Sequence, residues 1–100
     1  MSQVREVFYV DDGRGDYEWS ELHVYVHPAD ADRFAVNTDS GCSCDGYYDP
    51  TVEEARALDP LTAAEARDRI SQWLQNEGYE PDAKARELER ATLALRGEFR

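Results

Sequence analysis

The sequence predicts an α+β fold in which a three-stranded antiparallel β-meander is followed by two to three α-helices packed on one face of the sheet. Residues 1–50 contain β-branched and aromatic runs that are interrupted by Gly, Pro and Asp. Residues 51–100 contain two helix-capping patterns and apolar residues at helical spacing. The 100 residues match one domain, and a hydrophobic content of 41% is enough for a core. We therefore expect a single acidic α+β domain over residues 1–100, β-rich over 1–50 and helical over 51–100.

Three segments have the composition of strands. Residues 4–10 are rich in Val and aromatic residues, and residues 33–38 contain a similar shorter run. Residues 17–27 alternate in polarity, which places Leu22, Val24 and Val26 on one face of the strand and His23, Tyr25 and His27 on the other. The connections between the segments are short, which favours antiparallel neighbours. We expect the face with His23, Tyr25 and His27 to be free of helices and to meet solvent or a partner, with the side chains of His23 and His27 half exposed.

The second half of the chain predicts helices with defined ends. Two Thr-x-x-Glu patterns, beginning at Thr51 and Thr62, are capping boxes. Pro60 limits the first helix to a few residues, and Gly78 stands where the second helix should end in a left-handed residue. A third helix is expected over residues 82–96, with an apolar stripe made of Ala85, Leu88, Thr92 and Leu95.

The charge is large and unevenly distributed along the chain. The formal net charge is −11. Residues 1–50 contain eleven acidic residues and three arginines, a net charge of −8, whereas residues 51–100 contain eleven acids and eight bases, a net charge of −3. Such a field repels nucleic acid and anionic membranes, and it attracts basic proteins and divalent cations. Solubility alone is the simplest alternative explanation of the acidity.

A surface in the first half that binds basic partners would be formed by the acidic loop at residues 11–16 and the strand after it. The expected partner-binding residues are Asp11, Asp12, Asp16, Glu18, Trp19, Glu21 and Tyr25. Acids two apart on a strand lie about 6.6 Å from one another on one face, which suits a row of Arg and Lys side chains. The sequence has no apolar run near membrane-spanning length and no visible signal peptide, so we expect a cytoplasmic protein.

The most distinctive local pattern is Gly41-Cys42-Ser43-Cys44-Asp45-Gly46. Cys42 and Cys44 could supply two of four zinc ligands, and His23 is the candidate third. A Cys-x-Cys redox pair is a second interpretation, and two small thiols that simply fit a tight turn is a third. Because no second cysteine pair exists, we expect no cofactor and keep zinc as the alternative.

The segment Thr38-Asp39-Ser40-Gly41-Cys42-Ser43-Cys44 and the aromatic pair after it resemble a family of small uncharacterised proteins from actinobacterial phages and their hosts. The resemblance covers roughly residues 6–75, and Gly-Cys-Ser-Cys is its most specific part. It implies an accessory protein in a bacterial cytoplasm. It implies no catalytic residues.

Three functions remain open on the sequence. No phosphate loop, dinucleotide fingerprint or nucleophile elbow is present, so we expect no enzyme. The first hypothesis is an acidic protein that binds and blocks a basic surface of a host protein, as a nucleic-acid mimic of the anti-restriction or anti-CRISPR kind. The second is a small zinc-binding module. The third is a structural or assembly protein whose acidity serves solubility only.

Overall fold

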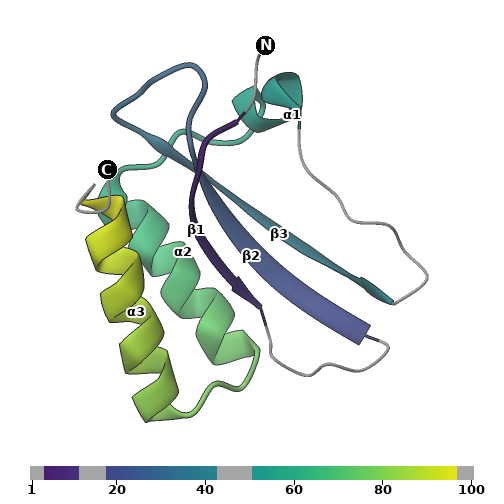
Figure 1. The fold of residues 1–100 in the computed structure, drawn as a ribbon, viewed down its shortest axis with the longest axis vertical. Helices are drawn as coiled ribbons and strands as arrows, with labels where there is room; N and C mark the ends of the chain where they lie inside the picture. Colours follow the sequence, from purple (N-terminus) through teal and green to yellow (C-terminus); the bar gives the residue numbers. More distant parts are fainter. Residues whose placement is uncertain (1–3, 12–17, 43–50, 97–100) are drawn as a thin grey trace.

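The computed structural model describes residues 4–11, 18–42 and 51–96, with the backbone alone at 18–19 and 39–42. The predicted α+β fold is confirmed (Figure 1). Its elements in chain order are β1 (Glu6–Asp11), β2 (Glu18–Val26), β3 (Phe34–Cys42), α1 (Val52–Arg56), α2 (Ala63–Asn76) and α3 (Pro81–Leu95). The strands form one antiparallel sheet in the order β1-β2-β3.

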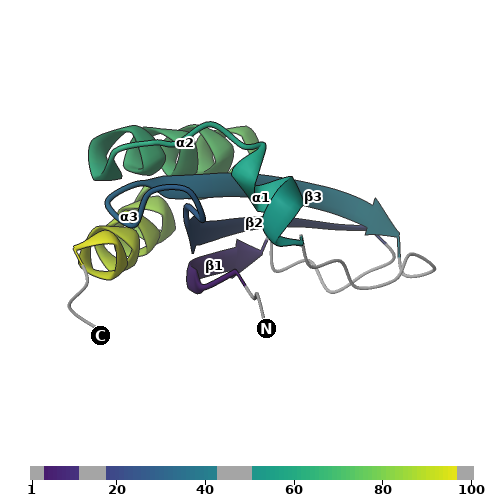
Figure 2. The same cartoon turned by 90° about the horizontal axis from the view of Figure 1, so that it is seen from above.

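One face of the sheet packs against α2 and α3, as Figure 2 shows from above. This core contains Phe8 and Val10 from β1 and the fully buried Leu22 and Val24 from β2. The helices contribute Ala66, Ile70, Trp73, Leu74, Ala91, Ala94 and Leu95. Burial of these apolar side chains is the main source of stability, since removal of apolar surface from water is worth about 25 cal/mol per Å².

Both expected capping boxes are present. Thr51 and Thr62 each accept a hydrogen bond from the backbone N–H three residues on, and Glu54 and Glu65 bond back to the capping residue. These bonds satisfy donors that the first helical turn leaves unpaired. Gly78 adopts a φ of +80° after α2, as predicted for a helix C-terminus.

Two details of α3 and β3 differ from the sequence-based expectation. β3 extends to Cys42 rather than ending at Thr38, because the whole of β2 pairs with it. In the apolar stripe of α3, Leu88 and Leu95 pack against the core as predicted, but Ala85 is exposed and Ala91 and Ala94 are buried instead. The cause is that α3 packs against α2 and β1 mainly through its C-terminal half, where Ala permits a close approach.

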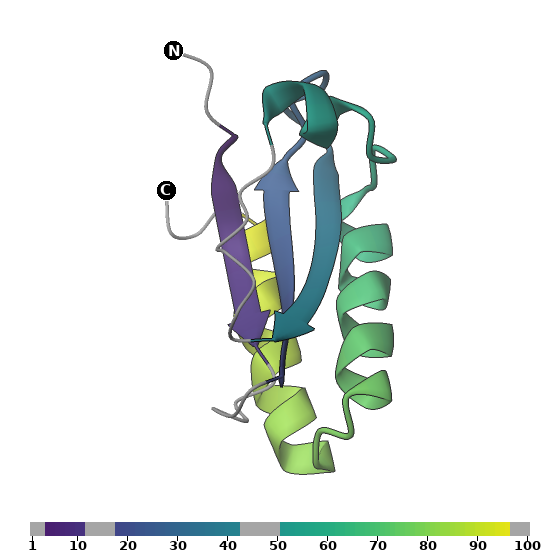
Figure 3. The same ribbon diagram turned by 90° about the vertical axis from the view of Figure 1, so that its right-hand side faces the viewer.

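The second face of the sheet is not free. The short helix α1 lies over it, opposite α2 and α3 (Figure 3). Ala55 of α1 is fully buried although it lies outside the core formed with α2 and α3. Next to it, the His27 imidazole Nε2 lies 2.8 Å from the Leu58 carbonyl oxygen, and its Nδ1 accepts a bond from the Ala29 N–H. The half exposure expected of His23 and His27 is therefore wrong: both residues, like Tyr25 on the same face, are only 3% exposed.

Candidate functional site

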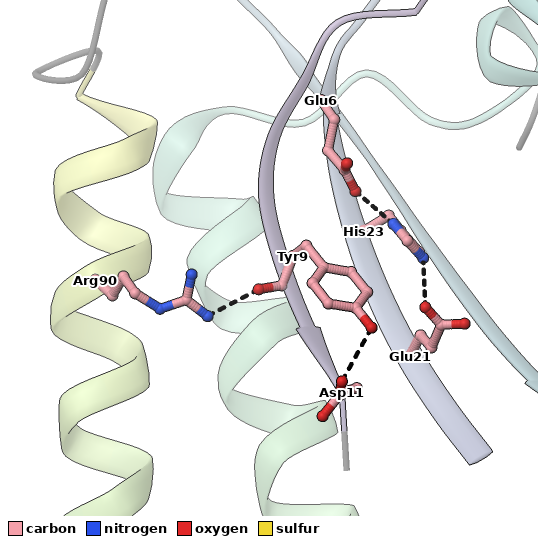
Figure 4. A network of polar contacts seen from close by, with 6 residues as sticks. All are labelled: Glu6, Tyr9, Asp11, Glu21, His23 and Arg90. Carbon is pink, nitrogen blue, oxygen red and sulfur yellow. Dashed lines mark hydrogen bonds and ion pairs between the residues drawn. The ribbon is translucent and has the colours of Figure 1, made fainter. Parts of the chain in front are cut away.

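The candidate site is a polar cluster on the second face of the sheet, made by Glu6, Tyr9 and Asp11 of β1 and Glu21 and His23 of β2 (Figure 4). We call it the His23 cluster. Strand pairing places Tyr9 opposite His23 and Asp11 opposite Glu21. Because opposed residues of antiparallel strands point to the same side, these side chains meet.

Glu6 joins the cluster through an irregularity in β1. Phe8 pairs with Val24 and points into the core, so strict alternation would place Glu6 on the core face as well. The register shifts between Glu6 and Phe8, and Glu6 pairs with Tyr25 instead. This β-bulge moves the Glu6 carboxylate to the second face, where it reaches His23.

The His23 imidazole lies between two carboxylates. Its Nδ1 contacts Glu6 Oε1, and its Nε2 lies 3.3 Å from Glu21 Oε2. A neutral imidazole has one N–H and can donate to one of these carboxylates, whereas the doubly protonated ring donates to both. The ring also lies 4.9 Å from the Tyr9 ring centroid and stacks at 6.0 Å on Tyr25. These contacts explain the burial of His23 and connect β1 to β2.

The hydrogen bonding and the pKa of the Tyr9 hydroxyl indicate the electrostatic potential within the cluster. The hydroxyl donates a hydrogen bond to Asp11 Oδ2 at 3.0 Å. The pKa of Tyr9 lies well above its ordinary value, first because burial disfavours the phenolate and then because Asp11 and Glu21 accept hydrogen bonds and add negative charge nearby. Tyr9 thus keeps its proton at neutral pH, and the cluster is a region of negative potential.

The outer edge of β1, away from β2, contacts α3. Arg90 donates from Nη2 to the Tyr9 carbonyl oxygen at 2.8 Å and pairs with Glu87 at 2.6 Å (Figure 4). Its guanidinium also lies 4.5 Å from the centre of the Phe8 ring. Arg90 therefore fixes the strand that carries three of the cluster residues.

The predicted partner-binding residues have different positions. Asp11 is exposed at the end of β1, and Glu21 belongs to the His23 cluster with a side chain that is 15% exposed. Tyr25 is buried, so it is a poor contact residue in this conformation. Glu18 and Trp19 begin β2, where only the backbone is described, and Asp12 and Asp16 lie outside the described residues.

The predicted zinc ligands are not brought together in the described part of the chain. Cys42 ends β3, where only the backbone is described, and Cys44 lies outside the described residues. Within residues 4–11, 18–42 and 51–96, no three His, Cys, Asp or Glu side chains are arranged to hold a metal ion. His23 already contacts a carboxylate with each ring nitrogen, so ligation would require it to release one of them.

Sequence reasoning missed Glu6, Tyr9 and Arg90. Alternation along β1 places Tyr9 and Asp11 on one face of the strand, so this pattern would have allowed the two residues to be grouped. The sequence contains no comparable signal for Glu6, which depends on the bulge, or for Arg90, which reaches β1 from a helix about 80 residues later in the chain.

The comparisons with known proteins give a family and nothing about chemistry. Searches of curated proteins and of solved structures found no significant match. Every helix in the described part of the chain is too short or too polar to traverse a bilayer. A family model described as "Domain of unknown function (DUF7574)" matches residues 1–97, nearly the whole chain. The chain therefore belongs to the DUF7574 family.

Proposed function

We propose that this protein is a non-enzymatic acidic accessory protein that binds and blocks a basic surface of a partner protein. The setting that we infer is the cytoplasm of a bacterial host, with a phage-type role. The basic surface belongs to a protein that normally binds nucleic acid, so the protein acts as a nucleic-acid mimic of the anti-restriction or anti-CRISPR kind.

The observation that carries the proposal is the excess of acids over arginines in the β-rich half, eleven against three. In the described part of the chain, Glu6 and Glu21 contact His23, and Arg90 pairs with Glu87 inside α3. The raised pKa of Tyr9 indicates negative potential in the same half, because Asp11 and Glu21 are among its causes. A partner rich in Arg and Lys would relieve this potential, just as it neutralises phosphates in its own ligand.

The acidic first loop extends this negative surface in sequence. Asp12 follows directly on Asp11 at the end of β1, Asp16 comes after Arg14 in the same loop, and Glu18 begins β2 on the other side. The zinc alternative receives no comparable support from the described residues, since His23 is committed to Glu6 and Glu21.

The test compares two variants that lose equal charge. In the first, Asp11, Asp12 and Asp16 are replaced by Asn. In the matched control, the exposed α3-region acids are neutralised by Glu80→Gln, Asp82→Asn and Glu89→Gln. Each variant is used as bait in host lysate over a salt series, and retained proteins are identified by mass spectrometry. We expect a basic nucleic-acid-binding protein to be retained by the wild type and the control and lost by the first variant, with retention falling as salt rises.

The retained partner then shows whether mimicry is the mechanism. Fluorescence anisotropy of labelled DNA bound to the purified partner should fall as the acidic protein is added, because both ligands use one basic surface. Failure to retain any basic protein at low salt contradicts the binding proposal. Equal retention by both variants contradicts the assignment to the first loop, and a ternary complex with DNA contradicts mimicry.

A further inference from the structure

The two edges of the sheet are treated differently. On the outer edge of β1, Arg90 donates to the Tyr9 carbonyl and the Tyr79 hydroxyl donates to the Asp11 carbonyl. Unpaired backbone groups on an edge strand invite pairing with another chain, and proteins usually block them. The edge formed by β1 is therefore closed by side chains from α3 and from the segment before it.

The outer edge of β3 is closed only where the strand begins. Phe34 exchanges two backbone hydrogen bonds of 2.8 Å with Leu61. Alternate residues of an antiparallel strand direct their N–H and C=O groups to the same edge. The backbone N–H and C=O of Val36 and Thr38 therefore point away from β2, as those of Phe34 do. Among the described residues, no backbone group outside the sheet bonds to Val36 or Thr38.

This part of β3 is accessible. Thr38 is exposed. Figures 1 and 2 both show the C-terminal part of β3 reaching away from α2 and α3. Val36, nearer the start of the strand, is partly buried against the core. β3 also lacks the Lys, Arg and Pro residues that commonly protect an edge strand.

The described charges next to β3 in the chain favour a basic occupant. The exposed Asp30 and Asp32 precede the strand and the exposed Glu53 lies on α1, whereas Arg33 lies at the closed start of the strand. Asp39 lies on β3 itself, opposite Glu21 in the register. A second copy of this chain would place the same acid-rich edge against itself, whereas a basic segment would complement it.

We propose that the outer edge of β3 at Val36 and Thr38 receives an extended, Arg- or Lys-rich segment of the partner as a fourth strand of the sheet. Backbone hydrogen bonds from Val36 and Thr38 provide the pairing, and the surrounding carboxylates select the charge. This inference rests on the proposed function and specifies how the basic partner is bound.

The first experiment measures amide hydrogen exchange by NMR in the wild-type protein. In the free protein, the outward N–H groups of Val36 and Thr38 should exchange fast, while those of Ala35 and Asn37, which face β2, should be protected. A peptide of alternating Arg and Val is then added. Slowed exchange at Val36 and Thr38 supports the proposal, and protection of both amides already in the free protein overturns it.

Two controls separate strand addition from attraction by charge. An Arg/Val peptide that is methylated at every backbone nitrogen has the same charge but no backbone N–H on either edge, so it should bind weakly and leave exchange at Thr38 unchanged. Thr38→Pro removes one outward N–H without touching the bonds to β2, and it should weaken binding of the Arg/Val peptide about tenfold relative to Thr38→Ala. The exchange experiment on the wild type decides the matter if Thr38→Pro does not fold.

The outcomes distinguish this inference from the proposed function. Equal binding of both peptides, or binding that leaves exchange at Val36 and Thr38 unchanged, overturns strand addition while the acidic surface retains its role. Failure of both peptides to bind at low salt also overturns strand addition. The proposed function is judged separately, by retention of a basic protein and its loss in the Asp11, Asp12 and Asp16 variant.

Discussion

Replacing His23 by alanine should lower the free energy of unfolding by about 3 kcal/mol. The imidazole donates to Glu6 or Glu21, and loss of a donor to a partly buried carboxylate costs about 1–3 kcal/mol; the cost is larger at Glu21, whose side chain is only 15% exposed. The Glu6 side chain is 39% exposed, so the same loss there costs no more than about 1 kcal/mol. Lost packing against the Tyr9 and Tyr25 rings adds about 1 kcal/mol.

Urea denaturation measures this loss, with an unchanged slope indicating that the native state stays compact. His23→Phe is the matched variant, because it retains the aromatic packing and removes only the polar contacts, and it should be less destabilising than alanine by about 1 kcal/mol. A double-mutant cycle with Glu21→Gln should give a coupling free energy of about 1 kcal/mol. A total loss below about 1 kcal/mol, or no coupling to Glu21, would refute the structural role assigned to this imidazole.

Three further predictions concern residues around the site. Folding raises the pKa of Tyr9 through burial and the nearby Asp11 and Glu21, so the protonated Tyr9 stabilises the fold fully below about pH 10 and less as the pH rises further. The fall in the urea midpoint between about pH 9 and about pH 11 should therefore be smaller for Tyr9→Phe than for the wild type. Arg90→Ala should cost about 2 kcal/mol through the lost bond to the Tyr9 carbonyl and the lost contact with the Phe8 ring, and a cost near zero in urea denaturation would contradict this. Gly78→Ala should cost about 1 kcal/mol, because φ is +80° while an added Cβ meets nothing within 4 Å; an unchanged melting temperature would argue against the left-handed conformation.

The acidic surface and the His23 cluster have distinct roles in this account. Glu6 and Glu21 are engaged with His23, and they hold two strands together. Asp11 belongs to the cluster through its hydrogen bond from Tyr9, and it also lies at the exposed end of β1, where the acidic loop begins. Variants of Glu6, Glu21 and His23 should therefore act mainly on stability, and variants of Asp12 and Asp16 mainly on binding.

Local patterns in the sequence were sufficient to predict the elements and much of the core. The two Thr-x-x-Glu capping boxes and the left-handed Gly78 depend on contacts within a few residues, so the chain specifies them locally. Alternation in β2 likewise separated Leu22 and Val24 from His23, because side chains of a strand point to opposite faces.

The tertiary structure alone decided which polar residues meet and which face is covered. Alternation cannot reveal the bulge after Glu6, which moves that carboxylate to the face of His23. Nor can it show that α1 crosses to the second face and buries His27, or that Arg90 closes the outer edge of β1. These features depend on contacts between segments far apart in the chain. The sequence by itself thus determined strands, helices and charge. The assembled fold determined the polar cluster, and it determined that no described backbone group outside the sheet bonds to β3 at Val36 and Thr38.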